Sequence, residues 1–373
     1  MVKSNFEKLI RDIPSLGWFP RAELFSGPTI LEPLENLSIN LGVNLFIKRD
    51  DTLPLAMGGN KVRQLEYYLG EAINQKADTI LITGSVQSNF ARLCAAAARK
   101  FGMKPIVQLE KRVPKSNLEY NRSGNVLLLK MLGAKIVYFS EGENEKQADE
   151  NLNIIADKLR KDGANPYIIH LGIDHRPLGA LGYTAAAVET IQQANEVKLE
   201  IDHIVLPTGS ALTHSGFLAG KSIMKHPATI HGICVRRASS LQTERVLRRT
   251  NEVGELLGYP NLVGVDAVNT DDTCLPPGYG RLNNYVSEAI KMSALEEGII
   301  LDPVYSGKAF AGLIYLIRSR VISSGQNVLF LHTGGVPANF GYQSELEPLY
   351  GSSENNLRVG GLSPSSSTNP LQQ

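Results

Sequence analysis

The segment with the clearest chemical potential is Gly58-Gly59-Asn60-Lys61, in which two glycines precede a lone lysine. Glycines let a backbone approach a ligand closely, and no acidic residue stands beside Lys61 to hold its charge. A lysine that is desolvated in a cleft has a lowered pKa and can form a Schiff base. The same four residues also fit a glycine turn with a solvated lysine at a helix start, so this motif does not identify a nucleophile by itself.

Two further segments follow strand-like runs and open helix-like ones, Gln87-Ser88-Asn89 and Thr208-Gly209-Ser210-Ala211-Leu212-Thr213. Backbone N–H groups at the start of a helix attract anions, so the first segment could bind a carboxylate and the second a phosphate. Each is also compatible with an ordinary N-cap or turn. The second segment has neither GK[ST] nor GxGxxG, which argues against an NTPase or a dinucleotide site.

Two tyrosines lie in loops framed by glycine and proline, Tyr279 in PGYG and Tyr305 in PVYSGK. Such tyrosines can act as acid–base or stacking groups, although many merely pack. Together, the motifs offer a candidate Schiff-base lysine, a carboxylate cup and a phosphate cup at strand ends. These are the groups that pyridoxal phosphate and an amino acid would need.

Strand-like and helix-like segments alternate along the chain, which predicts an α/β protein with parallel sheets covered by helices. We expect strands at 79–83, 106–109, 136–139, 166–170, 203–206, 229–235 and 327–332, and helices at 89–101, 124–132, 145–161, 178–193, 240–257 and 283–297. The order suggests two lobes. Residues 1–54 with 166–350 would form a large cofactor-binding domain and residues 55–165 a small one, while 351–373, rich in Ser, Pro, Asn and Gln, would be a disordered tail.

The composition excludes several classes of protein. Lys and Arg number 38 against 37 for Asp and Glu, so there is no net basic charge to hold nucleic acid or an anionic membrane. Cys94, Cys234 and Cys274 are widely spaced, which predicts neither disulfides nor a metal site. We find no signal-like N-terminus and no apolar run of about 18 residues. These features predict a cytoplasmic protein without a membrane or nucleic-acid partner.

In combination, the motifs resemble the D-cysteine desulfhydrase / 1-aminocyclopropane-1-carboxylate deaminase family. These are pyridoxal-phosphate enzymes of the two-lobed, tryptophan synthase β-like fold type II. The stretches that carry the resemblance are FIKRDD, AMGGNKVRQLEY, QSN, LGALGY, TGSALTHSG, PGYG, LDPVYSGKAFAGL and HTGG, in family order over roughly residues 15–350.

The resemblance implies a role for each site residue. Lys61 would bind the cofactor covalently and move protons at Cα, and Ser88, Tyr279 and Tyr305 would be the other catalytic residues. Cofactor contacts would come from Asn60, Asn89, Thr208, Gly209, Ser210, Ala211, Leu212, Thr213, Ser306 and Thr333. Substrate contacts would come from Gln87, Ser88, Asn89 and Arg176.

Three positions depart from the family pattern. Phe90 replaces a His or Gln, and Gln64 replaces a lysine that contacts the phosphate. The loop Gly172-Ile173-Asp174-His175-Arg176-Pro177 is one residue longer than usual and adds an imidazole and a guanidinium. It is either a drifted surface loop or a pocket edge suited to a more anionic substrate.

The expected activity is a pyridoxal-phosphate lyase that converts D-cysteine to pyruvate, ammonia and hydrogen sulfide, working as a homodimer. Ser306 and Thr333 favour it, because the family's desulfhydrases carry Ser or Thr and Thr at these positions and its deaminases carry Glu and Leu. The alternatives are a cysteate sulfo-lyase, a 1-aminocyclopropane-1-carboxylate deaminase and a catalytically dead binding protein. A dehydrogenase is disfavoured by the missing GxGxxG.

Overall fold

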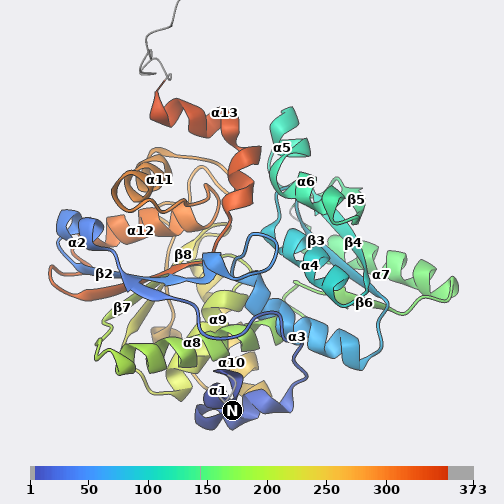
Figure 1. Cartoon of the computed structure of the whole chain (residues 1–373), viewed down its shortest axis with the longest axis horizontal. Helices are drawn as coiled ribbons and strands as arrows, with labels where there is room; N and C mark the ends of the chain where they lie inside the picture. The colour runs from blue at the N-terminus through green and yellow to red at the C-terminus, as the bar shows by residue number, and fades with distance from the viewer. Residues whose placement is uncertain (1–4, 143, 352–373) are drawn as a thin grey trace, which may run out of the picture.

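The computed structural model describes residues 5–142 and 144–351 and contains two separate, mainly parallel sheets (Figure 1). The larger sheet has the strand order β1-β2-β10-β7-β8-β9, and only the β1–β2 pair is antiparallel. Its strands are β1 (Leu31–Pro33), β2 (Asn44–Arg49), β7 (His203–Thr208), β8 (Thr229–Cys234), β9 (Asn269–Asp271) and β10 (Asn327–His332). Because the parallel strands run in one direction, their carboxyl ends share one edge of the sheet.

Alternate side chains of the buried strands serve the two faces of the large sheet. Val328 and Phe330 of β10 pack with one group of helices, and Leu329 and Leu331 pack with the other. Figure 1 shows α11 (Asn284–Glu297) and α12 (Ser306–Arg318) on one side of the sheet, with α8 (Leu178–Glu196), α9 (Leu212–Ile223) and α10 (Ser239–Leu257) on the other. The strands are therefore apolar on both faces, as parallel strands between helices must be.

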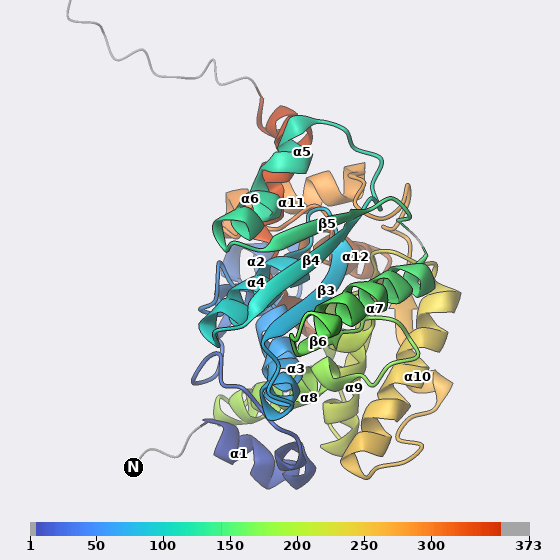
Figure 2. The same ribbon diagram turned by 90° about the vertical axis from the view of Figure 1, so that its right-hand side faces the viewer.

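The smaller sheet is fully parallel, in the order β5-β4-β3-β6. Its strands are β3 (Thr79–Ser85), β4 (Lys104–Glu110), β5 (Lys135–Phe139) and β6 (Pro166–Ile169). Ile80 and Ile82 belong to the core that includes α4 (Asn89–Lys100) and α6 (Gly124–Met131). Leu81 packs instead with Leu152 of α7 (Glu145–Lys161), which runs along the sheet in Figure 2.

The two-lobed α/β architecture expected from the sequence is confirmed, but the expected boundary at residue 165 is misplaced by one strand. β6 pairs with β3 from Thr79 opposite Pro166 to Ile82 opposite Ile169, so the small sheet extends to residue 169. The expected disordered tail at 352–373 lies outside the described residues. Within 5–142 and 144–351, no helix combines the length and apolar character needed to cross a membrane.

The remaining helices flank the two sheets. They are α1 (Asn5–Asp12), α2 (Glu35–Leu41), α3 (Lys61–Asn74), α5 (Leu118–Arg122) and α13 (Gln343–Leu346). Helix α3 packs against α8 at a glycine, because a Cβ on Gly182 would lie 2.1 Å from the carbonyl oxygen of Arg63. This close approach fixes the position of α3, and therefore of Lys61 at its start.

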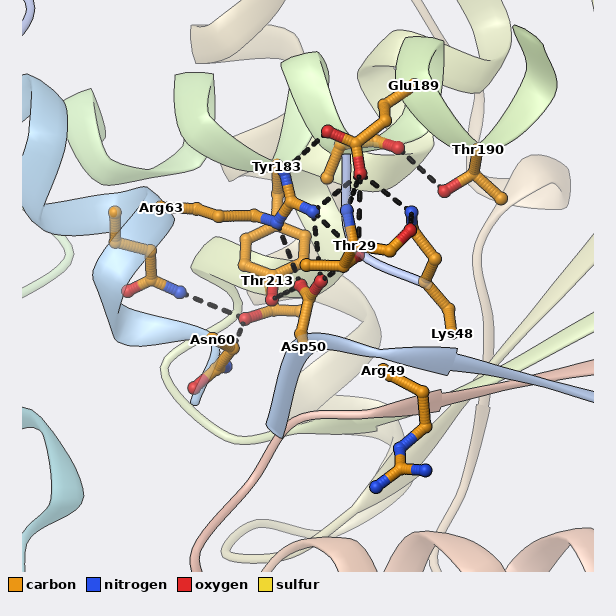
Figure 3. Close-up of polar contacts among 12 residues, drawn as sticks. Thr29, Lys48, Arg49, Asp50, Asn60, Arg63, Tyr183, Glu189, Thr190 and Thr213 are labelled. Carbon is orange, nitrogen blue, oxygen red and sulfur yellow. Dashed lines mark hydrogen bonds and ion pairs between the residues drawn. The ribbon is translucent and has the colours of Figure 1, made fainter. Parts of the chain in front are cut away.

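A buried cluster of charges joins α3 to β2 and α8 (Figure 3). The guanidinium of Arg63 bonds Asp50 at 3.0 Å and Glu189 at 2.8 Å, and Lys48 bonds the same Glu189 at 2.7 Å. These four side chains are at most 2% exposed, and their two positive and two negative charges cancel. Tyr183 donates to Asp50 at 2.6 Å. Burial raises the pKa of Glu189, but Arg63 and Lys48 outweigh it and lower the pKa to about 2.

We expect the substitution Glu189→Gln to lower the free energy of unfolding by about 3–5 kcal/mol, because two buried cations would then face a neutral amide. Urea unfolding followed by circular dichroism measures the loss. The matched control is Glu288→Gln, whose partner Arg318 is 52% exposed, and it should cost at most about 1 kcal/mol. Equal losses in the two variants would contradict a central role for the cluster.

Candidate active site

A pocket lies between the two lobes, at the carboxyl ends of β3, β4 and β7. Open α/β sheets bind their ligands at this edge. The pocket is lined by residues from each of the motifs found in the sequence. They are Asn60, Lys61, Ser88, Asn89, Thr208, Gly209, Ser210, Ala211, Thr213, Tyr279, Tyr305 and Thr333. The structure therefore brings together most of the residues that the sequence analysis selected from distant segments.

The loop before Lys61 has an unusual backbone that requires its glycines. Residues 56–59 all have positive φ, from 40° at Ala56 to 117° at Gly59. A Cβ on Gly58 would lie 2.0 Å from the carbonyl oxygen of Asp51, so no other residue fits there without rearrangement. Buried Arg92 of α4 holds this loop by donating to the carbonyl oxygen of Gly58 at 2.7 Å. The strained loop delivers Lys61 to the pocket at the first position of α3.

Lys61 has the environment of a nucleophilic amine. Desolvation by burial lowers its pKa to about 7, so a substantial share is neutral near physiological pH. Its Nζ lies 5.3 Å from the ring centroid of Phe90, which also lines the pocket. Phe90, a departure from the family pattern, thus supplies an apolar wall next to the lysine and can hold its charged form only through the ring face.

The β3–α4 connection has the structure expected of an anion-binding helix start. Ser88 is the N-cap of α4, and its Oγ accepts from the N–H of Ala91 at 3.1 Å. The expectation that Gln87 faces the substrate is wrong for its side chain, which does not line the pocket. Its amide donates to the carbonyl oxygens of Tyr120 and Ser123 and accepts from the N–H of Asn125. Gln87 therefore fixes the loop instead.

The β7–α9 connection, residues 208–213, is the predicted phosphate cup. Ala211 has a φ of 75° and α9 follows at Leu212, so the cup ends at a helix N-terminus, whose free backbone N–H groups favour an anion. Its binding of a phosphate stays a prediction. Asn60 and Gln64 each donate to Thr213 Oγ1 at 2.9 Å, which ties the cup to the start of α3. Figure 3 shows the contact between Asn60 and Thr213. Gln64, at the position of the family's lysine, thus makes an uncharged hydrogen bond to the cup. The side chain of Leu212 packs in the core, so Leu212 offers only its backbone to the phosphate cup.

An arginine cluster that the sequence analysis missed joins the two lobes beside this cup. Glu145, the first residue of α7, accepts from Arg236 at 2.8 Å and from Arg237, and pairs with Arg245 at 3.3 Å. Arg237 donates to the carbonyl oxygen of Gly209, and Arg245 to that of Ser210. Burial raises the pKa of Glu145, but the arginines reverse this and leave it below its usual value.

The two active-site tyrosines are in direct contact. The hydroxyls of Tyr279 and Tyr305 are 2.5 Å apart, and Ser85 Oγ lies 3.1 Å from that of Tyr279. Burial and the neighbouring tyrosine raise the pKa of Tyr305 well above its usual value, so it stays protonated. Tyr279 and Tyr305 both line the pocket, so this chain of hydroxyl groups can supply a proton donor there.

A second missed element is the Glu110–Arg112 pair at the end of β4. Arg112 donates from Nε and Nη2 to the two oxygens of Glu110, both at 2.8 Å, and Thr83 donates to the same carboxylate at 2.6 Å. Nη1 of Arg112 has no partner within residues 5–142 and 144–351, and both charged residues line the pocket. The spare hydrogen-bonding capacity of this pair is thus mainly that of a donor.

Besides Gln87 and Leu212, two expected contacts are absent from the residues that line the pocket. Arg176 is 59% exposed and lies 3.9 Å from Glu71 of α3, so its contact with a substrate stays a prediction. Ser306 is fully buried, and its hydroxyl donates to Asp302 at 2.7 Å. Since that proton is already used, a contact between Ser306 and a cofactor ring stays a prediction.

These observations fit pyridoxal phosphate on chemical grounds. The pocket has a desolvated amine for the aldehyde, a cup of N–H and hydroxyl groups for the phosphate, and apolar Phe90 and Val235 in its lining for the ring. His214, which also lines the pocket, is buried with both ring nitrogens unpartnered, and burial lowers its pKa to about 3. It is therefore neutral at the cup. The residues present can hold the cofactor.

Comparison with known proteins agrees with this site. Residues 22–334 match the family model described as pyridoxal-phosphate dependent enzyme. The chain belongs to this family of pyridoxal-phosphate-dependent enzymes.

Its relatives narrow the resemblance further. A D-cysteine desulfhydrase from Klebsiella pneumoniae (strain 342) is 39% identical over 334 residues, which are 90% of this chain and 99% of that protein. A D-cysteine desulfhydrase from Salmonella typhi is 37% identical over 324 residues, covering 87% and 96% of the two chains.

Solved structures bear out the expected fold type II. A structure described as an ACC deaminase homologue has a TM-score of 0.81 and 35% sequence identity, covering 91% of this chain and 98% of that one. An O-ureido-L-serine synthase has a TM-score of 0.60 at 16% identity, which shows a common fold alone.

We expect the apoprotein to capture pyridoxal phosphate at a rate that rises with pH up to about 7 and then levels off, because only the neutral amine of Lys61 attacks an aldehyde. Stopped-flow absorbance measures the rate. Borohydride reduction followed by peptide mapping should place the label on Lys61. A rate that keeps rising to about pH 10, or a label on Lys48 or Lys308, would refute the assignment.

Proposed function

We propose that the protein is a lyase that eliminates the Cβ substituent of a small amino acid, with D-cysteine as its substrate. D-Cysteine and water would give pyruvate, ammonia and hydrogen sulfide. The observation that carries the proposal is Lys61, a desolvated amine in one pocket with the Tyr279–Tyr305 pair. The D-cysteine desulfhydrases to which the chain is similar over nearly all of their length support the choice of substrate.

The pocket assigns the steps to different groups. When bound, the cofactor supplies an electron sink at Cα. The N-terminus of α4, with Ser88 and Asn89, would hold the substrate carboxylate through backbone N–H groups and side-chain donors. Lys61, with its pKa near 7, would take the Cα proton.

The departing sulfur would leave toward Tyr279, Tyr305 and Arg112, which line the same pocket. As the Cβ–S bond breaks, its electron pair goes to sulfur, and a hydroxyl proton or a guanidinium N–H can meet the developing charge. Arg112 is suited to this because only its Nε and Nη2 donate to Glu110, which also accepts from Thr83. The remaining N–H groups of the guanidinium can donate to a ligand. The released unsaturated amine then hydrolyses to pyruvate and ammonia.

Cysteate is the second candidate substrate, and one observation favours it. A sulfonate, like a thiolate, needs donors, and Arg112 presents a guanidinium to the pocket. The loop residue Arg176, on which this alternative first depended, is 59% exposed, lies next to Glu71 and does not line the pocket. Without a contact from Arg176 to the sulfonate, D-cysteine remains the preferred substrate over cysteate.

We also propose that the protein works as a homodimer in the cytoplasm, in amino-acid and sulfur catabolism. The dimer follows the family resemblance. Cys94, Cys234 and Cys274 are all buried free thiols, which suits a reducing compartment. Sedimentation analysis of the purified holoenzyme tests the dimer directly.

An ammonia-release assay of the holoenzyme should show the highest kcat/KM for D-cysteine among both enantiomers of cysteine, cysteate and serine and the cyclopropane amino acid. We expect this order because the pocket offers donors for a thiolate next to Lys61. Preference for cysteate would replace the thiol by a sulfonate leaving group. Preference for the cyclopropane amino acid would overturn the elimination altogether.

Replacing Arg112 by Gln should lower kcat/KM for D-cysteine by about 100-fold, the usual effect of losing one donor at a developing charge. With 3-chloro-D-alanine the loss should stay below about tenfold, because chloride leaves without a proton. The exposed control Arg176→Ala should change either value by no more than about twofold. Equal losses on both substrates would argue that Arg112 is only structural.

A further inference from the structure

Three potential metal ligands meet at the rim of the pocket. Asp149 of α7, His170 directly after β6 and His175 of the 172–177 loop have ligand atoms that all lie within 4.8 Å of one another. His170 Nδ1 is 3.3 Å from Asp149 Oδ1, and His175 Nε2 is 3.3 Å from Asp149 Oδ2. The sequence analysis predicted no metal site, because the members of this cluster come from three separate segments without a local ligand spacing.

Hydrogen bonding within the cluster does not account for it. Neither histidine–carboxylate contact has hydrogen-bond alignment, and Nδ1 of His170 is buried without a hydrogen-bond partner. Ligands of one tetrahedral ion lie about 3.3 Å apart when bond lengths are near 2.0–2.1 Å, and they point at the ion instead of at each other. The two nitrogen–oxygen distances, each to a different oxygen of the Asp149 carboxylate, are equal to this spacing.

The space around the carboxylate is kept open by a glycine. A Cβ on Gly172 would lie 2.6 Å from Asp149 Oδ2 and 3.6 Å from His175 Cδ2, so any larger residue would intrude on the cluster. Arg249 fixes the backbone here by donating to the carbonyl oxygens of Gly172, at 2.5 Å, and His175. The loop is thus held in place by groups other than the three ligands.

We infer that Asp149, His170 and His175 form a binding site for a divalent transition ion, with Zn²⁺ as the best match. Two imidazoles and one carboxylate are the ligand set of such ions, and they leave a coordination position for water or a small ligand. Mg²⁺ and Ca²⁺ are disfavoured because they prefer oxygen ligands.

One movement is needed for all three residues to reach the ion. The rings of His170 and His175 are stacked at 3.8 Å with an interplanar angle of 6°, so their in-plane lone pairs cannot converge. His175 is the more exposed ring, at 39%, and a tilt of this ring alone brings its nitrogen toward the ion. We therefore expect His175 to contribute less to affinity than Asp149 or His170.

The location gives the site a consequence for the pocket. Asp149 and Gly172 both line it, and the 172–177 loop leads from β6 of the small sheet into α8 under the large sheet. A bound ion would fasten α7 to this loop and leave an open coordination position at the pocket rim. The inference concerns metal binding alone and does not depend on which amino acid the enzyme uses.

The test uses tag-free holoenzyme that has been freed of metal by chelation. Calorimetric titration with Zn²⁺ should give one ion per chain, and Co²⁺ should give the visible absorption of a low-symmetry site. Asp149→Asn and His170→Ala should each weaken Zn²⁺ binding by at least about tenfold, and His175→Ala by less. His226→Ala is the matched control, because this partly buried histidine lies outside the cluster and should leave affinity unchanged.

Cofactor absorbance and the melting temperature without metal show whether each variant is folded, and Asp149→Asn preserves the side-chain volume if an alanine variant is not. Substoichiometric binding by the wild type would overturn the inference. So would Zn²⁺ affinity that is the same in Asp149→Asn, His170→Ala and the control.

Discussion

The buried ion cluster of Lys48, Asp50, Arg63 and Glu189 is the interaction on which the active site depends. Arg63 lies two residues after Lys61, and its guanidinium is bound to the carboxylates of Asp50, directly after β2, and Glu189 of α8. The first turn of α3 is therefore fixed from below by charges that cannot separate without leaving an unpaired ion in the core. Tyr183 completes the carboxylate of Asp50. A reactive amine on a strained loop needs such a rigid base.

Electrostatics also organises the other side of the pocket. Glu145 belongs to the small lobe, and the arginines that bind it follow β8 of the large lobe. Two of them, Arg237 and Arg245, also bond carbonyl oxygens of the phosphate cup. The guanidinium groups of Arg237 and Arg245 thus place positive charge next to the phosphate cup, although Gln64 replaces the lysine usual in the family. A neutral hydrogen bond from Gln64 and the charge of these arginines can together stabilise a bound anion.

The departures from the family pattern have different structural outcomes. Phe90 became an apolar wall beside Lys61, where it helps to keep water from the amine. The two added side chains of the 172–177 loop separated, with His175 joining Asp149 and Arg176 turning to solvent near Glu71. Two adjacent loop residues can therefore lie in different environments, one at the pocket rim and one in solvent, and the sequence pattern does not show which is which.

The sequence by itself determined the alternation of strands and helices and selected the lysine and the segment of the predicted phosphate cup. Buried parallel strands are apolar runs and a surface helix ends at a glycine, so β10 and α7 were both predicted to the residue. Motifs at the ends of parallel strands must meet at one sheet edge. Tertiary structure decided which polar residues face that edge. Glu110 is held at the pocket by Thr83 of the neighbouring strand and Glu145 by arginines of the other lobe, whereas the amide of Gln87 is bound by carbonyl groups of residues 120 and 123. Such choices depend on partners far apart in the chain, and local patterns carry no record of them.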